Sequence, residues 1–510
     1  EEKKIQATTA AYEKVADEVA GLHPDTIVIS SPHTIMYSDY FHISPGVHAR
    51  GDLSRFGAPQ VEFSLDYDST LADTLAVMAG MEGLRAGTEG EREKELDHGV
   101  MVPLYFIMQK YSEFRLLRVG LSGQPLSDHY RLGQLITKAA AELGRRIVYI
   151  ASGDLSHKMK EDGPYGFAPE GPQYDERIMQ VMGSGNFAEL FDFDEDFCDR
   201  AAECGHRSFV MMAGALDGRT VGAKALVHEA TFGVGYGICT FQIGEADENR
   251  KFLKNRIDRK KDEIAKQHAA QDPWVRIARA SLESFVCGGL RLDDVNAAVE
   301  QALNESNAED PEAIREQLLQ KRAGAFVSLH KDGQLRGCIG TILPVTGCVA
   351  EELIRNAVSA ATEDPRFSPV KPAEVPFLEY SVDVLGEPED IESKEQLDVK
   401  RYGVIVTSGY KRGLLLPDLD GVDTVEEQIA IASRKAGIRP GEPISLQRFE
   451  VIPGQRLGDV GVHDAGGEGI FIGFLRHGVF MLDTHHVRHI LTHAQQAQPA
   501  RGIDEFQFCR

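Results

Sequence analysis

The sequence predicts an α/β domain followed by an α+β domain, and three observations favour this order. In the first half, short apolar runs without polar alternation, typical of strands buried on both faces, alternate with amphipathic helices. A charged segment then interrupts the pattern, and beyond it a hairpin signal and several strands occur between helices. With 510 residues and 42% hydrophobic content, the chain can form two or three hydrophobic cores.

The α/β prediction depends on four elements near the start of the chain. The first helix has an apolar face made of Tyr12, Val15, Val19 and Leu22. It leads directly into an apolar strand at 26–30, and further buried strands are predicted at 116–121 and 147–151. A helix at about 132–143 lies between the last two strands. This layout is a βαβ unit, so we expect a mostly parallel sheet flanked by helices.

Polar residues follow the ends of these strands, where parallel sheets bind their ligands. His33 comes just after the first strand and His157 just after the third, while His98 and the Glu203–Cys204 pair lie in two other polar segments. Each residue alone is more often a capping or hydrogen-bonding group, and Glu203 near a helix start could serve the helix dipole. Together they include the ligand types that hold ferrous iron with two histidines and one carboxylate, with histidines left for proton transfer.

Five phrases along this domain carry a family resemblance. They are SPHTIMYSDYFHISPG (31–46), LDHGVMVPL (96–104), SGDLSH (152–157), ECGHRSFVMMAGAL (203–216) and FGVGYG (232–237). The series resembles the class III extradiol ring-cleavage dioxygenase family, in particular its Memo-like branch, the AmmeMemoRadiSam system protein B group. The resemblance implies an Fe(II)- and O₂-dependent oxidoreductase with an unknown small substrate, aromatic or otherwise chelating. It also implies His33 and Glu203 as metal ligands, Cys204 as a rival to Glu203, and His98 and His157 as catalytic acid and base.

The same resemblance leaves two matters open. The family pattern takes a first histidine ligand from a Pro-His-Pro-Pro type segment, which precedes the part of the pattern matched from Glu1 onward. Neither His23 nor His42 replaces that ligand by position, so we expect an incomplete site that holds metal weakly. A second interpretation is a non-catalytic or copper-binding Memo-like module. Such a module would work with the second domain and a radical-SAM protein partner in an assembly or modification system.

The second domain follows a charged helical linker. We place the first domain at 1–244, the linker at 245–271 and the second domain at 272–453. In the second domain, Asp272 and Pro273 begin a helix, Asp332-Gly333 forms a hairpin turn, and a capping box at 424–427 begins a later helix. The phrases that resemble the AMMECR family are GAFVSLHKDGQLRGCIGT (324–341), EDPRF (363–367), RGLLLP (412–417) and KAGI (435–438).

Arg336 and Cys338 stand out in the most specific of these phrases. We expect both to line a groove of the second domain, where a nearby cation would lower the pKa of a thiol. The alternative is that Cys338 packs as a small apolar residue in a strand, which is the commoner role of cysteine. The sequence places no histidine partner near Cys338, which favours packing over nucleophilic catalysis.

The rest of the sequence mainly excludes functions. The formal charge of −24 disfavours nucleic acid and anionic membranes as partners. Because no apolar run reaches the length of a membrane span and residues 1–20 do not resemble a signal peptide, we expect a cytoplasmic protein. Seven scattered cysteines without a CxxC pair argue against disulfides and a zinc ribbon.

Residues 454–510 form an unassigned histidine-rich tail, in which His485, His489 and His493 have helical spacing. A metal site or a solvated helix would explain that spacing. The oligomeric state stays open, with a homo-oligomer as one option.

Overall fold

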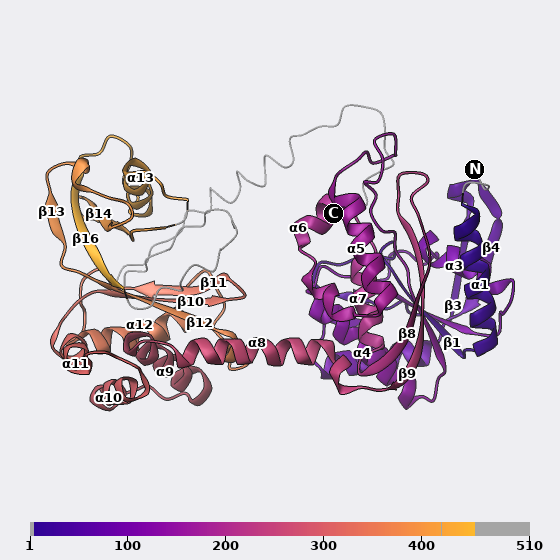
Figure 1. The fold of residues 1–510 in the computed structure, drawn as a ribbon, viewed down its shortest axis with the longest axis horizontal. Helices are drawn as coiled ribbons and strands as arrows, with labels where there is room; N and C mark the ends of the chain where they lie inside the picture. Colours follow the sequence, from indigo (N-terminus) through magenta and orange to yellow (C-terminus); the bar gives the residue numbers. More distant parts are fainter. Residues whose placement is uncertain (1–4, 420, 454–510) are drawn as a thin grey trace. The chain divides into compact units, whose positions relative to one another are not determined.

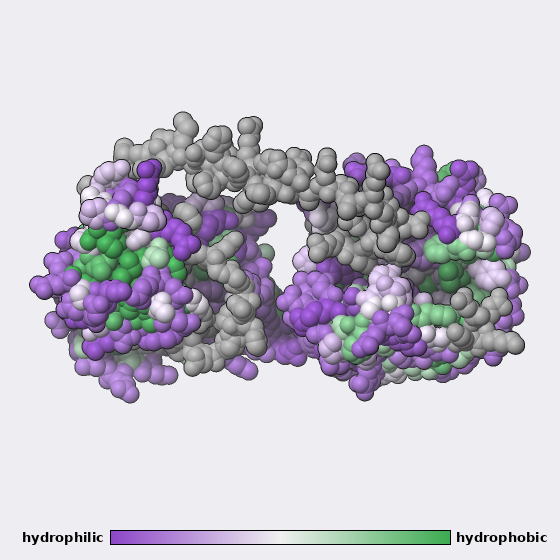
Figure 2. All heavy atoms as spheres, turned by 90° about the horizontal axis from the view of Figure 1, so that it is seen from above, coloured by the Kyte–Doolittle hydropathy of each residue, from purple (hydrophilic) through white to green (hydrophobic). Residues whose placement is uncertain are grey.

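The structure, a computed structural model, describes residues 5–419 and 421–453. Contacts divide the chain between Ile257 and Asp258 into two compact units (Figure 1). Each unit has its own hydrophobic cores. Figure 2 shows hydrophilic residues on both units, with hydrophobic patches among these residues. Within these described ranges, no helix is long and apolar enough to cross a bilayer.

The first unit is built on a parallel three-stranded sheet. Strand β1 (Thr26–Ser31) lies in the middle, between β6 (Arg115–Gly120) and β7 (Ile147–Ala151). Val28 of β1 pairs with Leu117 on one side and Tyr149 on the other. Because all three strands run in the same direction, their carboxyl ends lie at one edge of the sheet.

Helices cover both faces of this sheet. Val28 faces a core that it shares with α2 (Ser69–Met81) and α4 (Leu126–Glu142). Ile27 and Ile29 face the opposite core, which α1 (Gln6–Leu22) and α3 (His98–Met108) complete. This alternation explains why all six residues of β1 are buried. The α/β class predicted from the sequence is therefore confirmed.

Further helices and three small sheets complete the described part of the first unit. The helices are α5 (Glu170–Ser184), α6 (Glu195–Ala201) and α7 (His206–Ala215). The small sheets pair β2 (Phe41–His42) with β5 (Ala86–Gly87), β3 (His48–Leu53) with β4 (Ala58–Asp66), and β8 (Arg219–Glu229) with β9 (Tyr236–Ala246).

The second unit combines helices with an antiparallel sheet, which confirms the predicted α+β class. Its helices are α9 (Pro273–Gly288), α10 (Val295–Glu305), α11 (Pro311–Gln320), α12 (Val349–Thr362) and α13 (Val425–Lys435), and α8 (Phe252–Ala269) spans the boundary between the units. Asp272 caps α9 by accepting a 2.9 Å hydrogen bond from the backbone N–H of Val275. Thr424 and Glu427 form the predicted capping box of α13.

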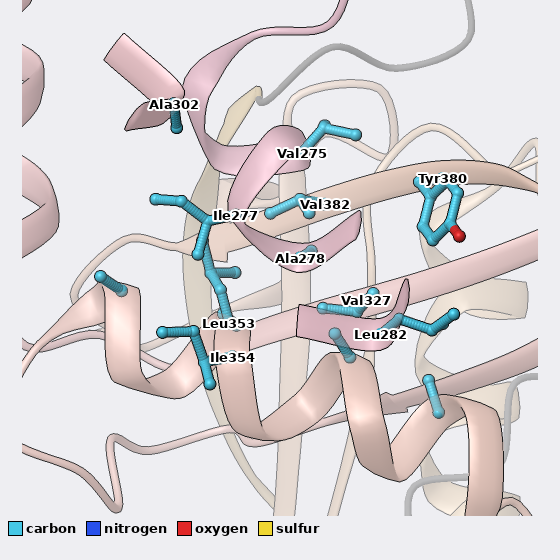
Figure 3. Packing of buried hydrophobic residues seen from close by; sticks show 14 of the residues in the cluster. Val275, Ile277, Ala278, Leu282, Ala302, Val327, Leu353, Ile354, Tyr380 and Val382 are labelled. Carbon is cyan, nitrogen blue, oxygen red and sulfur yellow. The ribbon is translucent and has the colours of Figure 1, made fainter. Parts of the chain in front are cut away.

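Hydrophobic cores lie on both faces of the sheet of the second unit. In order across the sheet, its strands are β11 (Gln334–Gly340), β10 (Ala325–Lys331), β12 (Glu379–Leu385), β16 (Ser445–Pro453), β14 (Tyr402–Ser408) and β15 (Lys411–Leu415), with β13 (Glu389–Ile391) paired to β16. On one face, Val327 and Val382 pack with Leu282 and Leu353 from helices α9 and α12 (Figure 3). On the other face, side chains from β11, β10, β14, β15 and β16 share a smaller core.

Candidate metal and proton-transfer site

His33 and His98 lie against each other at the carboxyl edge of the parallel sheet. Their ring centroids are 4.0 Å apart. Asp97 holds the two segments together, because it caps α3 and also accepts hydrogen bonds from Ser31 Oγ at 2.7 Å and Thr34 Oγ1 at 2.8 Å. His33 therefore lies between Ser31 and Thr34, and both of these residues are hydrogen-bonded to Asp97 at the start of α3.

Gly99 makes this close packing possible. A Cβ at this position would lie 2.6 Å from Ser31 Oγ and 3.1 Å from the His33 ring, too close for an ordinary contact. The backbone oxygen of Gly99 also accepts a 2.6 Å hydrogen bond from Ser152, which follows β7. The start of α3 thus lies next to the ends of both β1 and β7.

Three potential metal ligands meet beside this histidine pair. One donor atom each from Asp154, His157 and Cys204 lies within 4.8 Å of the other two. His157 Nε2 is 3.4 Å from Asp154 Oδ2, and the backbone N–H of Asp154 donates to Cys204 Sγ at 3.2 Å. His157 Nδ1 bonds to the carbonyl of Ala202, which leaves Nε2 available to a metal. A carboxylate, an imidazole and a thiol in this arrangement fit a transition-metal ion.

Two glycines let the loops that carry these donors cross. Gly153 has a φ of +152°, and a Cβ there would lie 2.3 Å from the Cα of Gly205. The carbonyl of Asp154 accepts backbone hydrogen bonds from Cys204 at 3.4 Å and Gly205 at 3.1 Å. The segment after β7 and the segment before α7 are therefore joined backbone to backbone, so Cys204 lies next to Asp154.

A buried carboxylate on α5 is hydrogen-bonded to the loop that carries His157. Asp175 on α5 is fully buried and accepts a 2.8 Å hydrogen bond from the backbone N–H of Ser156. Its other oxygen lies 2.7 Å from Nε2 of His228 on β8. Both carboxylate oxygens of Asp175 thus have a hydrogen-bond partner. They connect Ser156, the residue before His157, to α5 and β8.

Glu203, for which the family resemblance implied a ligand role, lies at the start of α7. Its Oε2 accepts a 2.6 Å hydrogen bond from the backbone N–H of His206 in the first turn of α7, which is the helix-start role considered as the alternative. Burial raises the pKa of Glu203 to about 7, against the lowering effect of that hydrogen bond. Its neighbour Cys204, the rival ligand, is the one that joins the donor set.

The histidines of the site have opposite pKa shifts. Burial and repulsion from His98 lower the pKa of His33 to about 4, although Asp97 and Asp154 oppose the shift. Burial would also lower the pKa of His157, but its hydrogen bonds to Asp154 and to the carbonyl of Ala202 outweigh burial and raise it. His33 is therefore unprotonated at neutral pH.

Aromatic side chains border the site. The Tyr165 ring meets His157 edge-on with centroids 4.9 Å apart, and Phe56 lies 5.1 Å from the His98 ring. Burial, with the nearby charge of Asp154, raises the pKa of Tyr12 to about 12 and also raises the pKa of Tyr236. Both phenols therefore stay protonated at neutral pH.

The structure brings His33, His98 and His157 to one edge of the sheet, with Glu203 within electrostatic reach of His157. Asp154 was not singled out from the sequence, although it lies in the SGDLSH phrase three residues before His157. The signal was the carboxylate on the same loop as a candidate histidine. The tail histidines, including His485, lie outside the described residues.

In the second unit, the structure corrects the groove predicted for Cys338. Its side chain is fully buried in the core formed with Phe326 and Leu414, so it takes the packing role. Burial raises the pKa of this thiol to about 11, which keeps it protonated. Arg336 is also largely buried and forms a two-pronged ion pair with Glu374, at 2.9 and 3.1 Å.

Comparison with known proteins agrees with both units. Residues 1–239 match the family described as the catalytic LigB subunit of aromatic ring-opening dioxygenase, and residues 293–453 match the AMMECR1 family. A Clostridium acetobutylicum protein is 40% identical over 458 residues, covering 88% of this chain and 94% of the relative. A Thermotoga maritima protein is 53% identical over 145 residues, which are 28% of this chain and 83% of the relative.

Two solved structures of uncharacterized proteins are also similar. The one from Pyrococcus horikoshii is 30% identical, covers 36% of this chain and 91% of its own, and has a TM-score of 0.30. The one from Escherichia coli K12 is 15% identical, covers 46% of this chain and 92% of its own, and has a TM-score of 0.32. Since the Clostridium relative spans both units, the chain belongs to the family that joins a LigB-type, extradiol dioxygenase-like domain to an AMMECR1 domain.

Proposed function

We propose that the first unit is a metal-dependent oxidoreductase of the extradiol dioxygenase type, which uses Fe(II) and O₂. The observation that carries this proposal is the meeting of Asp154, His157 and Cys204 beside the His33–His98 pair. Iron accepts carboxylate, imidazole and thiolate ligands, and the carboxyl edge of a parallel sheet is where ligands bind in such folds. The match of residues 1–239 to a ring-opening dioxygenase family supports the same chemistry.

The residues divide into metal ligands and proton carriers. A ferrous ion held by Asp154, His157 and Cys204 would supply the redox chemistry toward O₂. His33 is unprotonated at neutral pH because burial and His98 lower its pKa to about 4, so it can accept a proton from a substrate hydroxyl. Glu203, whose pKa burial raises to about 7, can hold a proton near His157. His33 and Glu203 thus act as proton carriers in this proposal rather than as ligands.

The proposed substrate is a small aromatic or otherwise chelating molecule. Tyr165 and Phe56 border the two sides of the site next to His157 and His98, and aromatic walls favour a flat apolar ligand. Tyr12 and Tyr236 keep their phenol protons and can bind substrate oxygens. An aromatic molecule with adjacent hydroxyl groups is flat and apolar and also offers oxygens for hydrogen bonding.

A copper-binding module is the second candidate, and the Cys204 thiol is the observation that favours it. Thiolate is a soft ligand that binds Cu(I) well, whereas extradiol iron sites of the two-histidine, one-carboxylate type contain none. In this candidate, the first unit would hold copper without turnover. It would act with the AMMECR1 domain and a radical-SAM protein partner.

Metal loading under anaerobic conditions tests both candidates. The full chain is incubated with Fe(II) or Cu(I) and desalted, its metal content is measured, and oxygen uptake is then recorded with catechol as the probe substrate. We expect iron retention and catechol-dependent oxygen uptake, both lost in Asp154→Asn and Cys204→Ala. The exposed Asp162→Asn on the same loop is the matched control. Copper retention without oxygen uptake would favour the second candidate. Metal retention that does not depend on Asp154, His157 or Cys204 would contradict both.

A further inference from the structure

The FGVGYG phrase at 232–237, which joins β8 to β9, lies against the loop that carries two of the proposed metal ligands. The backbone N–H of Leu155 donates to the carbonyl of Gly235 at 3.0 Å. In return, the N–H of Gly235 donates to the carbonyl of Ser156 at 2.8 Å. The phrase is therefore hydrogen-bonded through its backbone to the two residues between the ligands.

Glycine is required in this phrase because the chain also approaches α5 closely. A Cβ at Gly235 would lie 1.9 Å from Oδ2 of Asp175, which is on α5. A Cβ at Gly237 would lie 2.6 Å from Sδ of Met179, one turn further along the same helix. Only residues without a side chain fit between the ligand loop and the helix at these two positions.

Ser156 is fully buried, and each of its polar groups has a partner. Its N–H donates to Oδ1 of Asp175 at 2.8 Å, its carbonyl accepts from Gly235, and its hydroxyl donates to the carbonyl of Ala201 at 2.7 Å. This residue lies between the two ligands of the loop, whose side chains are 3.4 Å apart. The position of Ser156 therefore limits how far these two ligands can separate.

Asp175, which binds Ser156, has its second partner on β8. Nε2 of His228 lies 2.7 Å from Oδ2 of Asp175, and an ionised carboxylate only accepts hydrogen bonds, so this nitrogen carries the proton. The hydrogen bond to Asp175 raises the pKa of His228, while partial burial opposes the shift. A buried carboxylate is costly without donors, so His228 stabilises Asp175 in the charged form that binds Ser156.

Another histidine–aspartate pair of the first unit differs from this one in its exposure. Nδ1 of His48 lies 2.8 Å from Oδ1 of Asp66, but the two side chains are 74% and 67% exposed. Water can replace a hydrogen bond at such a position. The side chain of Asp175 is only 1% exposed, so water cannot take the place of His228 there without a change in the surrounding structure.

We propose that His228 is a positioning residue for the metal site of the first unit. Its hydrogen bond fixes Asp175, which in turn fixes Ser156 and so holds the ligands on either side of that residue at their separation. His228 acts through these residues and not as a ligand. The FGVGYG phrase has the same role, because it binds the loop from its other side. This inference rests on the metal-dependent function proposed above.

Cobalt titration of the full chain under anaerobic conditions tests the proposal. Co(II) accepts the same ligand types as Fe(II), and its visible absorption bands report the arrangement of its ligands. We expect His228→Leu to weaken Co(II) binding at least about tenfold and to change the bands of the bound ion at saturation. His228→Gln should keep the affinity within about threefold, because the glutamine amide can still donate to Asp175. His48→Leu is the matched control and should behave like wild type.

The outcomes separate this inference from the proposed function. If wild type and His228→Leu bind cobalt with the same affinity and spectrum, the positioning role is wrong and the metal site stands. If wild type binds no cobalt, the metal function fails and this inference fails with it. Leu132→Ala, which truncates a core residue of the same unit, controls for a general loss of stability and should keep the wild-type spectrum at saturation.

Amide hydrogen exchange of the metal-free protein tests the same contacts without a metal. The N–H of Ser156 is buried and bonded to Asp175, so it should exchange slowly in wild type. We expect its exchange to be at least about tenfold faster in His228→Leu and close to the wild-type rate in His228→Gln. An unchanged rate in His228→Leu would show that Ser156 is fixed without His228, which would overturn the proposal.

Discussion

Glu203 and Cys204 are neighbours in the sequence, but their side chains make different hydrogen bonds. The Glu203 carboxylate accepts a hydrogen bond from the start of α7, so part of its bonding capacity serves the helix. The Cys204 sulfur faces Asp154 and accepts a hydrogen bond from its backbone. The two residues that compete for one ligand role therefore make different contacts: Glu203 binds the start of α7, and Cys204 lies beside Asp154.

The first prediction compares these neighbours. Cys204→Ala should weaken metal binding at least about tenfold, because it removes one of three donors. Glu203→Gln keeps an acceptor oxygen for the helix start and should change metal affinity less than about threefold. Competition with a chelator of known affinity measures both. The reverse ranking would show that the carboxylate of Glu203, and not the thiol, is the ligand.

The second prediction concerns His129, which is fully buried on α4. Burial lowers its pKa from 6.5 to about 3, although a hydrogen bond to the carbonyl of Pro125 opposes the shift. Between these two values, the unfolded chain binds a proton that the folded chain does not, so stability falls as the pH is lowered. At pH 5, the loss relative to neutral pH is about 2 kcal/mol.

Denaturant unfolding at pH 7 and pH 5 checks this expectation. His129→Gln should be less stable than wild type at pH 7, because its bond to Pro125 is lost, but should lose about 2 kcal/mol less on going to pH 5. His48→Gln is the control, since His48 is exposed. A pH dependence in His129→Gln equal to that of wild type would mean that His129 is protonated in the folded state.

The site residues show how far the sequence alone can predict a site. His33 and His157 could be placed at one sheet edge because each follows an apolar strand, and parallel strands end together. The choice between Glu203 and Cys204 depends on which side chain the first turn of α7 binds, and a linear pattern does not contain that information. The burial of Cys338 depends on strand pairing with Ser328 and on contacts with distant β15, so it also required the fold.

Among the elements, the crossing of the Gly153 and Gly205 loops is the feature on which the donor set depends. Gly153→Ala should cost at least about 2 kcal/mol, because a Cβ would collide with the Cα of Gly205 and the φ of +152° disfavours other residues. Metal affinity should fall together with the stability, because the same loop crossing holds Cys204 next to Asp154. Thermal unfolding and metal titration measure the two effects.

Gly80→Ala is the matched control for this third prediction. Gly80 lies in α2, and a Cβ there would meet nothing within 4 Å, so the variant should be unchanged or up to about 1 kcal/mol more stable. If Gly153→Ala behaves like Gly80→Ala, the loop crossing tolerates a side chain and the close approach is not required.

Buried elements were easier to predict than exposed ones. The apolar run at 147–151 coincides with β7, and the capping box at 424–427 begins α13. The hairpin of β3 and β4 was not predicted, although Val61, Phe63 and Leu65 alternate with polar residues in β4. Its strands pair with each other, and Ala49 and Leu65 join the core that α1 and α3 complete, which are contacts that only the fold supplies.

At the scale of the whole molecule, the two units should unfold separately. Each unit has its own hydrophobic cores, and none of the described cores combines residues of one unit with residues of the other. Leu132→Ala and Leu353→Ala, at fully buried positions of the first and second unit, should each lower one calorimetric transition by removing about 2–5 kcal/mol. These two variants assign the transitions.

The fourth prediction uses that assignment. A metal ion bound only by the folded first unit stabilises that unit by about 2.7 kcal/mol at a free concentration one hundred times the dissociation constant. We therefore expect the transition lowered by Leu132→Ala to rise by about 5 °C with saturating metal, while the transition lowered by Leu353→Ala stays unchanged. His157→Gln should abolish the shift, because it removes one donor from the set. An equal rise of both transitions, or a rise that persists in His157→Gln, would show that the metal binds elsewhere in the chain.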